Sequence, residues 1–310
     1  AILEYKKALE INPNAQEARL WLGISYSSVS KFKEAIDEFE IYTSSNAENA
    51  FAYFEYAKTL SLDKNYDEAL KKVRTAINIK PNDVGFRVLL SQIYGKMDKS
   101  ADQIKELKTI LDDNPGHPYI HRTLAIAYDA NNQHELAIKE FKEHLESSNS
   151  DVYAYYRLAL VFNRLNKIPE AIEAFKASVK IDPAYQASYH ELGIIYDGKL
   201  GKHEDAINQF RKSIQVKDNA YSRTYLSYIY AHRLGNIQEA FKEGLLALKI
   251  DPEEEWAHFH LAGLYQQIGN FKSALIHKKK SANLRKGISG YQHPYAEALI
   301  GVAYTLDLMG

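Results

Sequence analysis

The sequence predicts an all-α fold, an α-solenoid built from a row of antiparallel helix pairs. Self-similarity with a period of 34 residues runs through the 310-residue chain, and such a period is typical of repeat proteins. Within each period, apolar residues recur at spacings of three and four, as in "LWLGISY" and "EAIDEFEIY". This spacing predicts two amphipathic helices per period and leaves no place for strands.

Three series of residues keep the period in one register. The first is a series of alanines that slips once by one residue within "YDGKLGKHEDA" and has Gln103 in one place: Ala1, Ala35, Ala69, Ala137, Ala171, Ala206, Ala240 and Ala274. The second is a series of large residues: Tyr26, Leu60, Tyr94, Tyr128, Phe162, Tyr196, Tyr230, Tyr265 and Tyr304. The third is a series of prolines: Pro13, Pro81, Pro115, Pro183 and Pro252.

Each period is predicted to start with a helix containing a small residue, which lets the second helix approach closely. These small residues are Gly23, Ala57, Ala125, Ala159, Gly193 and Ala262. A turn follows, signalled by Gly269-Asn270 and lengthened at "GKLG" and "AHRLG". The second helix carries the alanine series and ends before the proline.

In chain order, the pattern predicts a lone second helix, then eight whole units from about Gln16 to Lys286, then a lone first helix. The junction over residues 283–295 is predicted to be irregular, because "SANLRKGISGYQHPYAE" is longer than the period allows.

The chain resembles the tetratricopeptide repeat (TPR) family. The family pattern is met nearly in full by "HLAGLYQQIGNFKSA", and by "ELGIIY" followed by "EDAINQFRKS". The resemblance implies a right-handed superhelix and a single solenoid domain over residues 1–310. Neither end has the polar surface of a capping repeat, so we expect a fragment of a longer protein, open to self-association through its ends.

Composition excludes several classes of function. The chain has no cysteine, which rules out disulfides and thiolate chemistry. The net charge of -1 makes nucleic acid the least favoured partner. No apolar run is long enough to insert in a membrane, and the compartment stays open, with the cytoplasm favoured. No catalytic constellation is present, so we predict neither an enzyme nor a cofactor.

The resemblance implies that first helices line a concave groove, and function is therefore expected there. The places that match the family's groove are Leu20, Trp21, Ile24, Phe51, Phe54, Lys58, Val88, Gln92, Tyr119, Arg122, Tyr153, Tyr156, Arg157, Asn163, His190, Tyr221, Tyr228, Trp256 and Phe259. Glu191, Tyr225 and His260 lie on the same helix faces. Aromatic residues dominate, as they do among interface anchors. Neither the carboxylate clamp of chaperone-binding repeats nor the asparagine ladder of O-linked sugar transferases is present.

Other candidate sites are interpreted structurally. The pairs His117/His121 and His258/His260 lack the further ligands that a metal needs. The acids Glu253 to Glu255 are expected to cap a helix, where carboxylates favour the positive end of the dipole. The basic run "HKKKSANLRK" is expected to be a solvated outer face.

The sequence thus favours an adaptor that binds a peptide or helical segment of a partner protein in an aromatic groove. The alternative is a regulatory arm of a larger enzyme, such as a sensor kinase or a glycosyltransferase, whose catalytic domain lies outside these residues.

Overall fold

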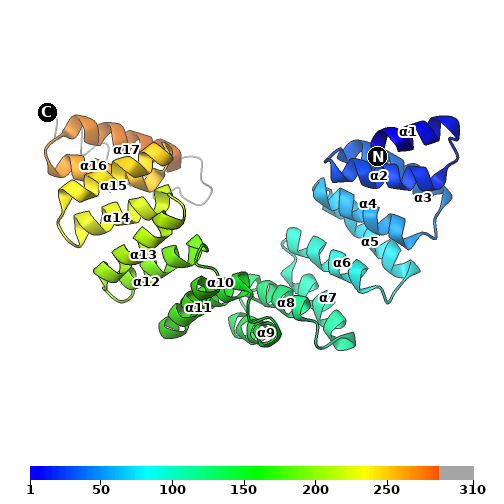
Figure 1. Cartoon of the computed structure of the whole chain (residues 1–310), viewed down its shortest axis with the longest axis horizontal. Coiled ribbons are helices and arrows are strands. Elements are labelled where there is room, and N and C mark those ends of the chain that lie inside the picture. Colours follow the sequence, from blue (N-terminus) through cyan, green and yellow to red (C-terminus); the bar gives the residue numbers. More distant parts are fainter. Residues whose placement is uncertain (286–310) are drawn as a thin grey trace. The chain divides into compact units, whose positions relative to one another are not determined.

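The structure, a computed structural model, describes residues 1–285 and consists there of helices without strands (Figure 1). The predicted all-α class is therefore confirmed. The chain divides into two compact units at Asn149 and Ser150. Whether all 310 residues form one domain stays a prediction.

The first unit contains a lone helix and four helix pairs: α1 (Ile2–Ile11), α2 (Gln16–Ser28), α3 (Phe32–Ser45), α4 (Ala50–Leu62), α5 (Tyr66–Ile79), α6 (Val84–Lys96), α7 (Ser100–Asp113), α8 (Pro118–Ala130) and α9 (His134–Ser147). The described part of the second unit contains four more pairs: α10 (Val152–Arg164), α11 (Ile168–Ile181), α12 (Gln186–Gly198), α13 (His203–Val216), α14 (Ala220–His232), α15 (Ile237–Ile250), α16 (Glu255–Gln267) and α17 (Phe271–Arg285).

These boundaries match the predicted repeats. The eight expected units begin at Gln16, the first residue of α2, and the last pair ends at Arg285. Helix α1 is the predicted lone second helix. Residues 283–285 form the end of α17, whereas the rest of the irregular junction and the expected final helix lie outside the described residues.

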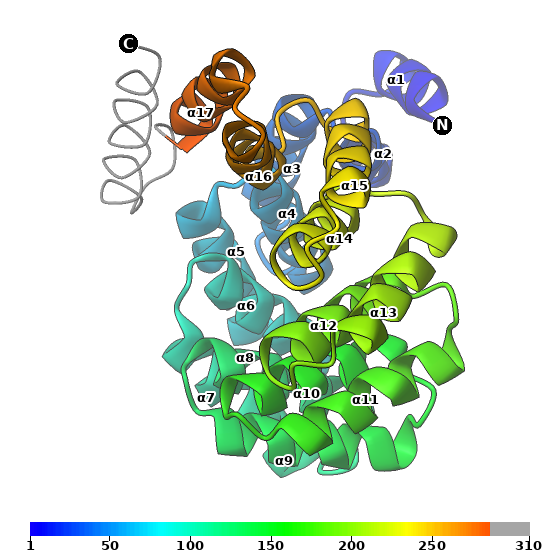
Figure 2. The same cartoon turned by 90° about the vertical axis from the view of Figure 1, so that its left-hand side faces the viewer.

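Neighbouring first helices pack against one another within each unit. In the first unit α2 contacts α4 and α4 contacts α6, and in the second α14 contacts α16. Among the described helices, no second helix approaches the next second helix to the same extent. Figure 2 shows the order α10, α12, α14, α16 along the second unit. The first helices therefore share one face of each unit, the face on which the groove was predicted.

The small residues of the period are buried where two helices cross. Ala57, Ala125 and Ala159 are fully buried, and a Cβ added to Gly193 would lie 2.7 Å from the ring of Phe210 on the second helix of the pair. Close packing of this kind leaves no room for a larger side chain. The predicted reason for the small residues is thus confirmed.

Each turn inside a helix pair contains one residue in the left-handed backbone conformation. This residue has a positive φ in every described pair: Ser30, Lys64, Asp98, Asn132, Asn166, Gly201, Gly235 and Gly269. The predicted one-residue slip is confirmed, because α13 starts 35 residues after α11. Four residues separate α12 from α13 and α14 from α15, as expected for the two lengthened turns.

The prolines follow the second helices as predicted, each two residues beyond a helix end, as Pro183 follows Ile181. Between residues 1 and 285, no helix has the length and apolar character that a membrane crossing requires.

Candidate functional site

Most predicted groove residues carry accessible surface. Exposed are Trp21, Phe51, Lys58, Tyr119, Tyr153, Tyr221, Trp256 and Phe259. Half-buried are Ile24, Phe54, Val88, Gln92, Arg122, Tyr156, Arg157, Asn163, His190 and Tyr228. Both tryptophans are among the exposed residues, at 44% for Trp21 and 48% for Trp256.

Leu20 does not belong to an accessible surface. Its side chain is 4% exposed and packs in the apolar core of the first unit with Leu22 and Tyr26. The helical pattern indicates the helix face on which Leu20 lies, but it does not indicate how deeply neighbouring side chains bury it. Leu20 therefore stabilises its helix pair and is removed from the candidate groove.

In the first unit, two predicted residues touch a side chain on the next first helix. The ring of Phe54 on α4 lies 5.2 Å from that of Phe86 on α6. The amide of Gln92 on α6 donates to the hydroxyl of Tyr119 on α8 at 3.3 Å. These contacts join neighbouring repeats, and Trp21 takes part in neither.

The second unit holds a pocket between α14 and α16. Its volume is about 200 Å³, ample for a side chain, since a single water needs only about 10–15 Å³ measured in this way. Seven residues line it: Tyr221, Thr224, Tyr225, Tyr228, Glu254, Trp256 and His260. Of the predicted groove residues, the pocket brings together Tyr221, Tyr228 and Trp256.

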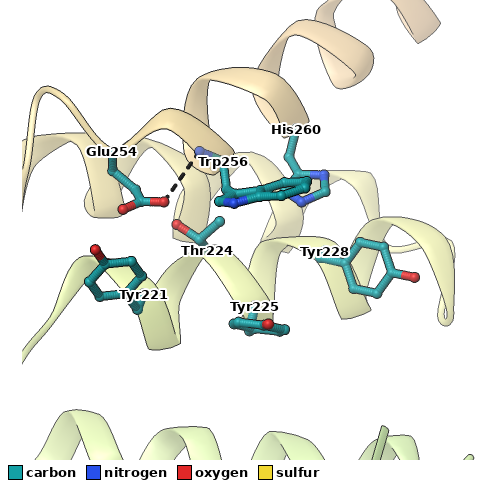
Figure 3. Close-up of a pocket in the computed structure, with 7 residues that line it drawn as sticks. All are labelled: Tyr221, Thr224, Tyr225, Tyr228, Glu254, Trp256 and His260. Atoms are coloured by element: carbon teal, nitrogen blue, oxygen red, sulfur yellow. Dashed lines mark hydrogen bonds between the residues drawn. The ribbon is translucent and has the colours of Figure 1, made fainter. Parts of the chain in front are cut away.

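Figure 3 shows how the rings are disposed. Trp256 and Tyr225 are both seen edge-on, one above the other, so their planes are nearly parallel. Tyr221 and Tyr228 flank them on opposite sides, and the Glu254 carboxylate lies at the Tyr221 end. One Glu254 oxygen accepts a hydrogen bond from the backbone N–H of Trp256 at 3.2 Å.

The two parallel rings are held by packing from outside the pocket. Tyr225 stacks on the fully buried ring of Phe210, with 5.2 Å between centroids, and meets His190 edge-on at 5.3 Å. The guanidinium of Arg285 lies 5.2 Å from the centre of the Trp256 ring. Because Phe210, His190 and Arg285 do not line the pocket, these contacts fix the rings without filling it.

A second pocket adjoins the first along the same face. It has a volume of about 250 Å³ and shares Tyr221 with the first pocket. Its other lining residues are Tyr156, Gln186, Ala187, His190, Glu191, Ser213 and Asn219. Tyr153 and Arg157 line neither pocket; they pair with each other, the Arg157 guanidinium donating to the Tyr153 hydroxyl at 2.9 Å.

Burial shifts the pKa values of titratable residues that line both pockets. Loss of hydration lowers the pKa of His190 to about 4. Loss of hydration, with smaller contributions from His232 and Arg285, lowers the pKa of His260 to about 4. Both imidazoles are therefore neutral near pH 7. Loss of hydration also raises the pKa of the Glu191 and Glu254 carboxyls.

Models of the tetratricopeptide repeat match residues 122–185 and 187–219. Anaphase-promoting complex subunit 3 from Schizosaccharomyces pombe is 28% identical over 105 residues, which are 34% of this chain and 16% of that protein. The chain thus spans a small part of its curated relative.

The chain belongs to the tetratricopeptide repeat family. Solved structures share the fold. The C-terminal part of a TPR protein from Cytophaga hutchinsonii matches with a TM-score of 0.64 at 15% identity, over 78% of this chain and 99% of that one. YrrB, a TPR protein with an unusual peptide-binding site, matches with a TM-score of 0.51 at 16% identity, over 62% of this chain and 98% of that one.

Tetratricopeptide repeats are typical of protein-interaction scaffolds, and their fold is typically non-catalytic. No group of three or more histidine and acidic side chains in residues 1–285 is arranged to hold a metal. His121 bonds to Glu140 at 2.6 Å and to the Pro115 carbonyl at 2.8 Å, contacts that join the helices of one repeat.

The prediction of a solvated basic face on α17 of the TPR chain is wrong for Arg285. This side chain is 8% exposed, because its guanidinium pairs with Glu255 at 2.7 Å and lies over Trp256 and Phe259. Ion pairing compensates the charge that burial removes from water.

Two lining residues, Thr224 and Glu254, were missed as groove residues in the sequence. Glu254 was expected to cap a helix, and it does cap α16. Its place at the N-cap of a first helix, two residues before Trp256, was the available signal, since a capping side chain there lies beside the groove.

Proposed function

We propose that this TPR chain binds an extended or helical segment of a partner protein along the first helices of its second unit. The observation that carries the proposal is the pair of adjoining pockets over α10, α12, α14 and α16, joined by Tyr221. Exposed rings that are held rigidly provide contact area at low entropic cost.

The exposed rings in this region also support the proposal. Tyr221 is 61% exposed, while Trp256 and Phe259 are close to half exposed. Clusters of exposed apolar side chains with a polar rim are common at protein interaction sites. Peptide binding also occurs in a protein of the same fold, YrrB, which has an unusual peptide-binding site.

Substitution of Trp256 tests this function. We expect Trp256→Ala to weaken partner binding by about 2 kcal/mol or more, as for a central aromatic anchor. Leu245→Ala is the matched control, since Leu245 lies on the second helix α15 and is 47% exposed. Calorimetric titration of both variants with a partner peptide selected from a random library provides the measurement. Equal affinities for the two variants and the unchanged chain would contradict the proposal.

A further inference from the structure

We propose that the pocket between α14 and α16 binds the guanidinium group of an arginine in the partner segment. This inference rests on the proposed function and specifies the chemistry of the partner. It depends on the shape of the pocket, on the rigidity of its rings and on the charges around it.

The shape of the pocket suits a flat group. The nearly parallel planes of Trp256 and Tyr225 border an open space, with Tyr221 and Tyr228 at its sides (Figure 3). A guanidinium is planar and stacks on aromatic faces, whereas an ammonium is a compact and strongly hydrated charge. A slot between two rings therefore favours arginine over lysine.

The rings are held in place before a ligand binds. Phe210 supports Tyr225 from its outer face, and Arg285 with Phe259 supports Trp256. The contact with Arg285 indicates that the Trp256 ring already takes part in a cation–π interaction. A ring fixed in advance loses little entropy on binding.

Glu254 supplies charge complementarity. It is 4% exposed and is the sole charged residue among the seven that line the pocket, because His260 is neutral near pH 7. Its buried carboxylate lies beside Tyr221 and accepts one backbone hydrogen bond. A guanidinium in the pocket would compensate the hydration that this carboxylate has lost.

Two arginines lie over rings that line the pocket, and both are paired with acids of the same chain. Arg285 bonds to Glu255 at 2.7 Å, and Arg233, which lies over Tyr228, bonds to Asp197 at 3.3 Å. Neither lines the pocket. Pairing weakens the repulsion between these charges and a further cation between the rings, although Arg285 still helps to lower the pKa of His260.

The adjoining pocket also presents a carboxylate to the groove. It contains Glu191 and no lysine or arginine among its lining residues. Both pockets therefore present one carboxylate each to the same segment. We expect the partner segment to carry a second basic side chain near the arginine.

The experiment uses the full chain and a random peptide display library. Peptides that bind the unchanged chain are enriched after removal of those that also bind Trp256→Ala. The tightest peptide is then synthesised with citrulline in place of each arginine, because citrulline keeps the shape of the side chain and lacks its charge. Affinities are measured by calorimetry.

We expect one arginine-to-citrulline change to weaken binding by about tenfold, as for loss of a charge-assisted contact. Glu254→Gln should weaken binding of the arginine peptide by a similar factor and remove most of the difference between arginine and citrulline. Glu253→Gln is the matched control, because the Glu253 carboxylate pairs with Lys280 at 2.9 Å outside the pocket. It should bind like the unchanged chain.

The outcomes separate the two proposals. If peptides depend on Trp256 but bind equally well with citrulline, the groove function stands and the arginine inference is wrong. If no enriched peptide depends on Trp256, both proposals are wrong. Trp256→Phe, which keeps an aromatic ring, is compared with Trp256→Ala by circular dichroism so that loss of binding is not confused with unfolding.

Discussion

Two histidines on the groove, His190 and His260, lose hydration when the second unit folds. Their neutral forms are favoured, which places both pKa values near 4 instead of 6.5. His121 behaves in the opposite way. Burial, the largest single effect, lowers its pKa, but the hydrogen bonds to Glu140 and the Pro115 carbonyl, together with the charges of Glu140 and Glu143, outweigh burial and raise the pKa. The residue type alone does not predict the direction of the pKa shift, because that direction depends on the groups packed around each histidine.

These shifts predict a pH dependence of stability. Between pH 6.5 and about 4, the unfolded chain binds a proton at the position of His260 and the folded chain does not. The free energy of unfolding therefore falls as the pH falls through this range, by about 1.4 kcal/mol per unit of pKa difference. Glu191 and Glu254 oppose the trend, since their raised pKa values favour protonation in the folded state.

Substitution isolates the contribution of one histidine. In urea unfolding, the stability of the unchanged chain relative to His260→Gln should decrease from pH 7 to pH 4. For His121→Gln the relative stability of the unchanged chain should increase as the pH falls, because a raised pKa stabilises the folded state when the histidine is protonated. If the relative stability depends on pH in the same way for both variants, the assignment of these shifts to burial and to Glu140 is contradicted.

At the level of the element, the turn inside each helix pair depends on a left-handed residue. Glycine occupies this place in three turns, and other residues occupy it in five. The glycine signal near Gly269 was readable from the sequence. The matching role of Lys64 was not, since lysine carries no turn signal and only the structure shows its φ of 65°.

A pair of glycine substitutions tests this dependence. Gly269 has a φ of 76°, so Gly269→Ala should destabilise the last pair by about 1–2 kcal/mol. Gly263 lies within α16, where an added Cβ meets no atom within 4 Å, and Gly263→Ala should stabilise by up to about 1 kcal/mol. Hydrogen exchange of α16 and α17 measures both effects. Shifts of the same sign would contradict the turn assignment.

At the level of the whole molecule, the helix pairs within each unit pack on their neighbours in the sequence. The stability of such an array is close to a sum of repeat and neighbour terms. The alanine, tyrosine and proline series were sufficient to predict eight repeats, because each series marks a contact that recurs. Residues that differ between repeats were not predicted. The depth of Leu20, the ion pair of Arg285 and the place of Glu254 in the pocket depend on particular neighbours.

The division at Asn149 and Ser150 predicts where the chain can be cut. Fragments 1–149 and 150–310 should both remain folded, because each keeps whole helix pairs with apolar cores of their own. Their circular dichroism spectra should sum to that of the whole chain within roughly 10%. A cut at Asn166 separates α10 from α11 and should lose helicity. A large loss for the first cut would contradict the prediction.

The left-handed turn residues have a practical consequence for protein engineering. A glycine placed at such a position removes the steric penalty of a side chain, and contributions from separate repeats add nearly independently. Glycine substitutions in these surface turns should therefore raise the thermal stability of the array without changing the aromatic groove. The five turn positions with a positive φ that are not yet glycine are Ser30, Lys64, Asp98, Asn132 and Asn166.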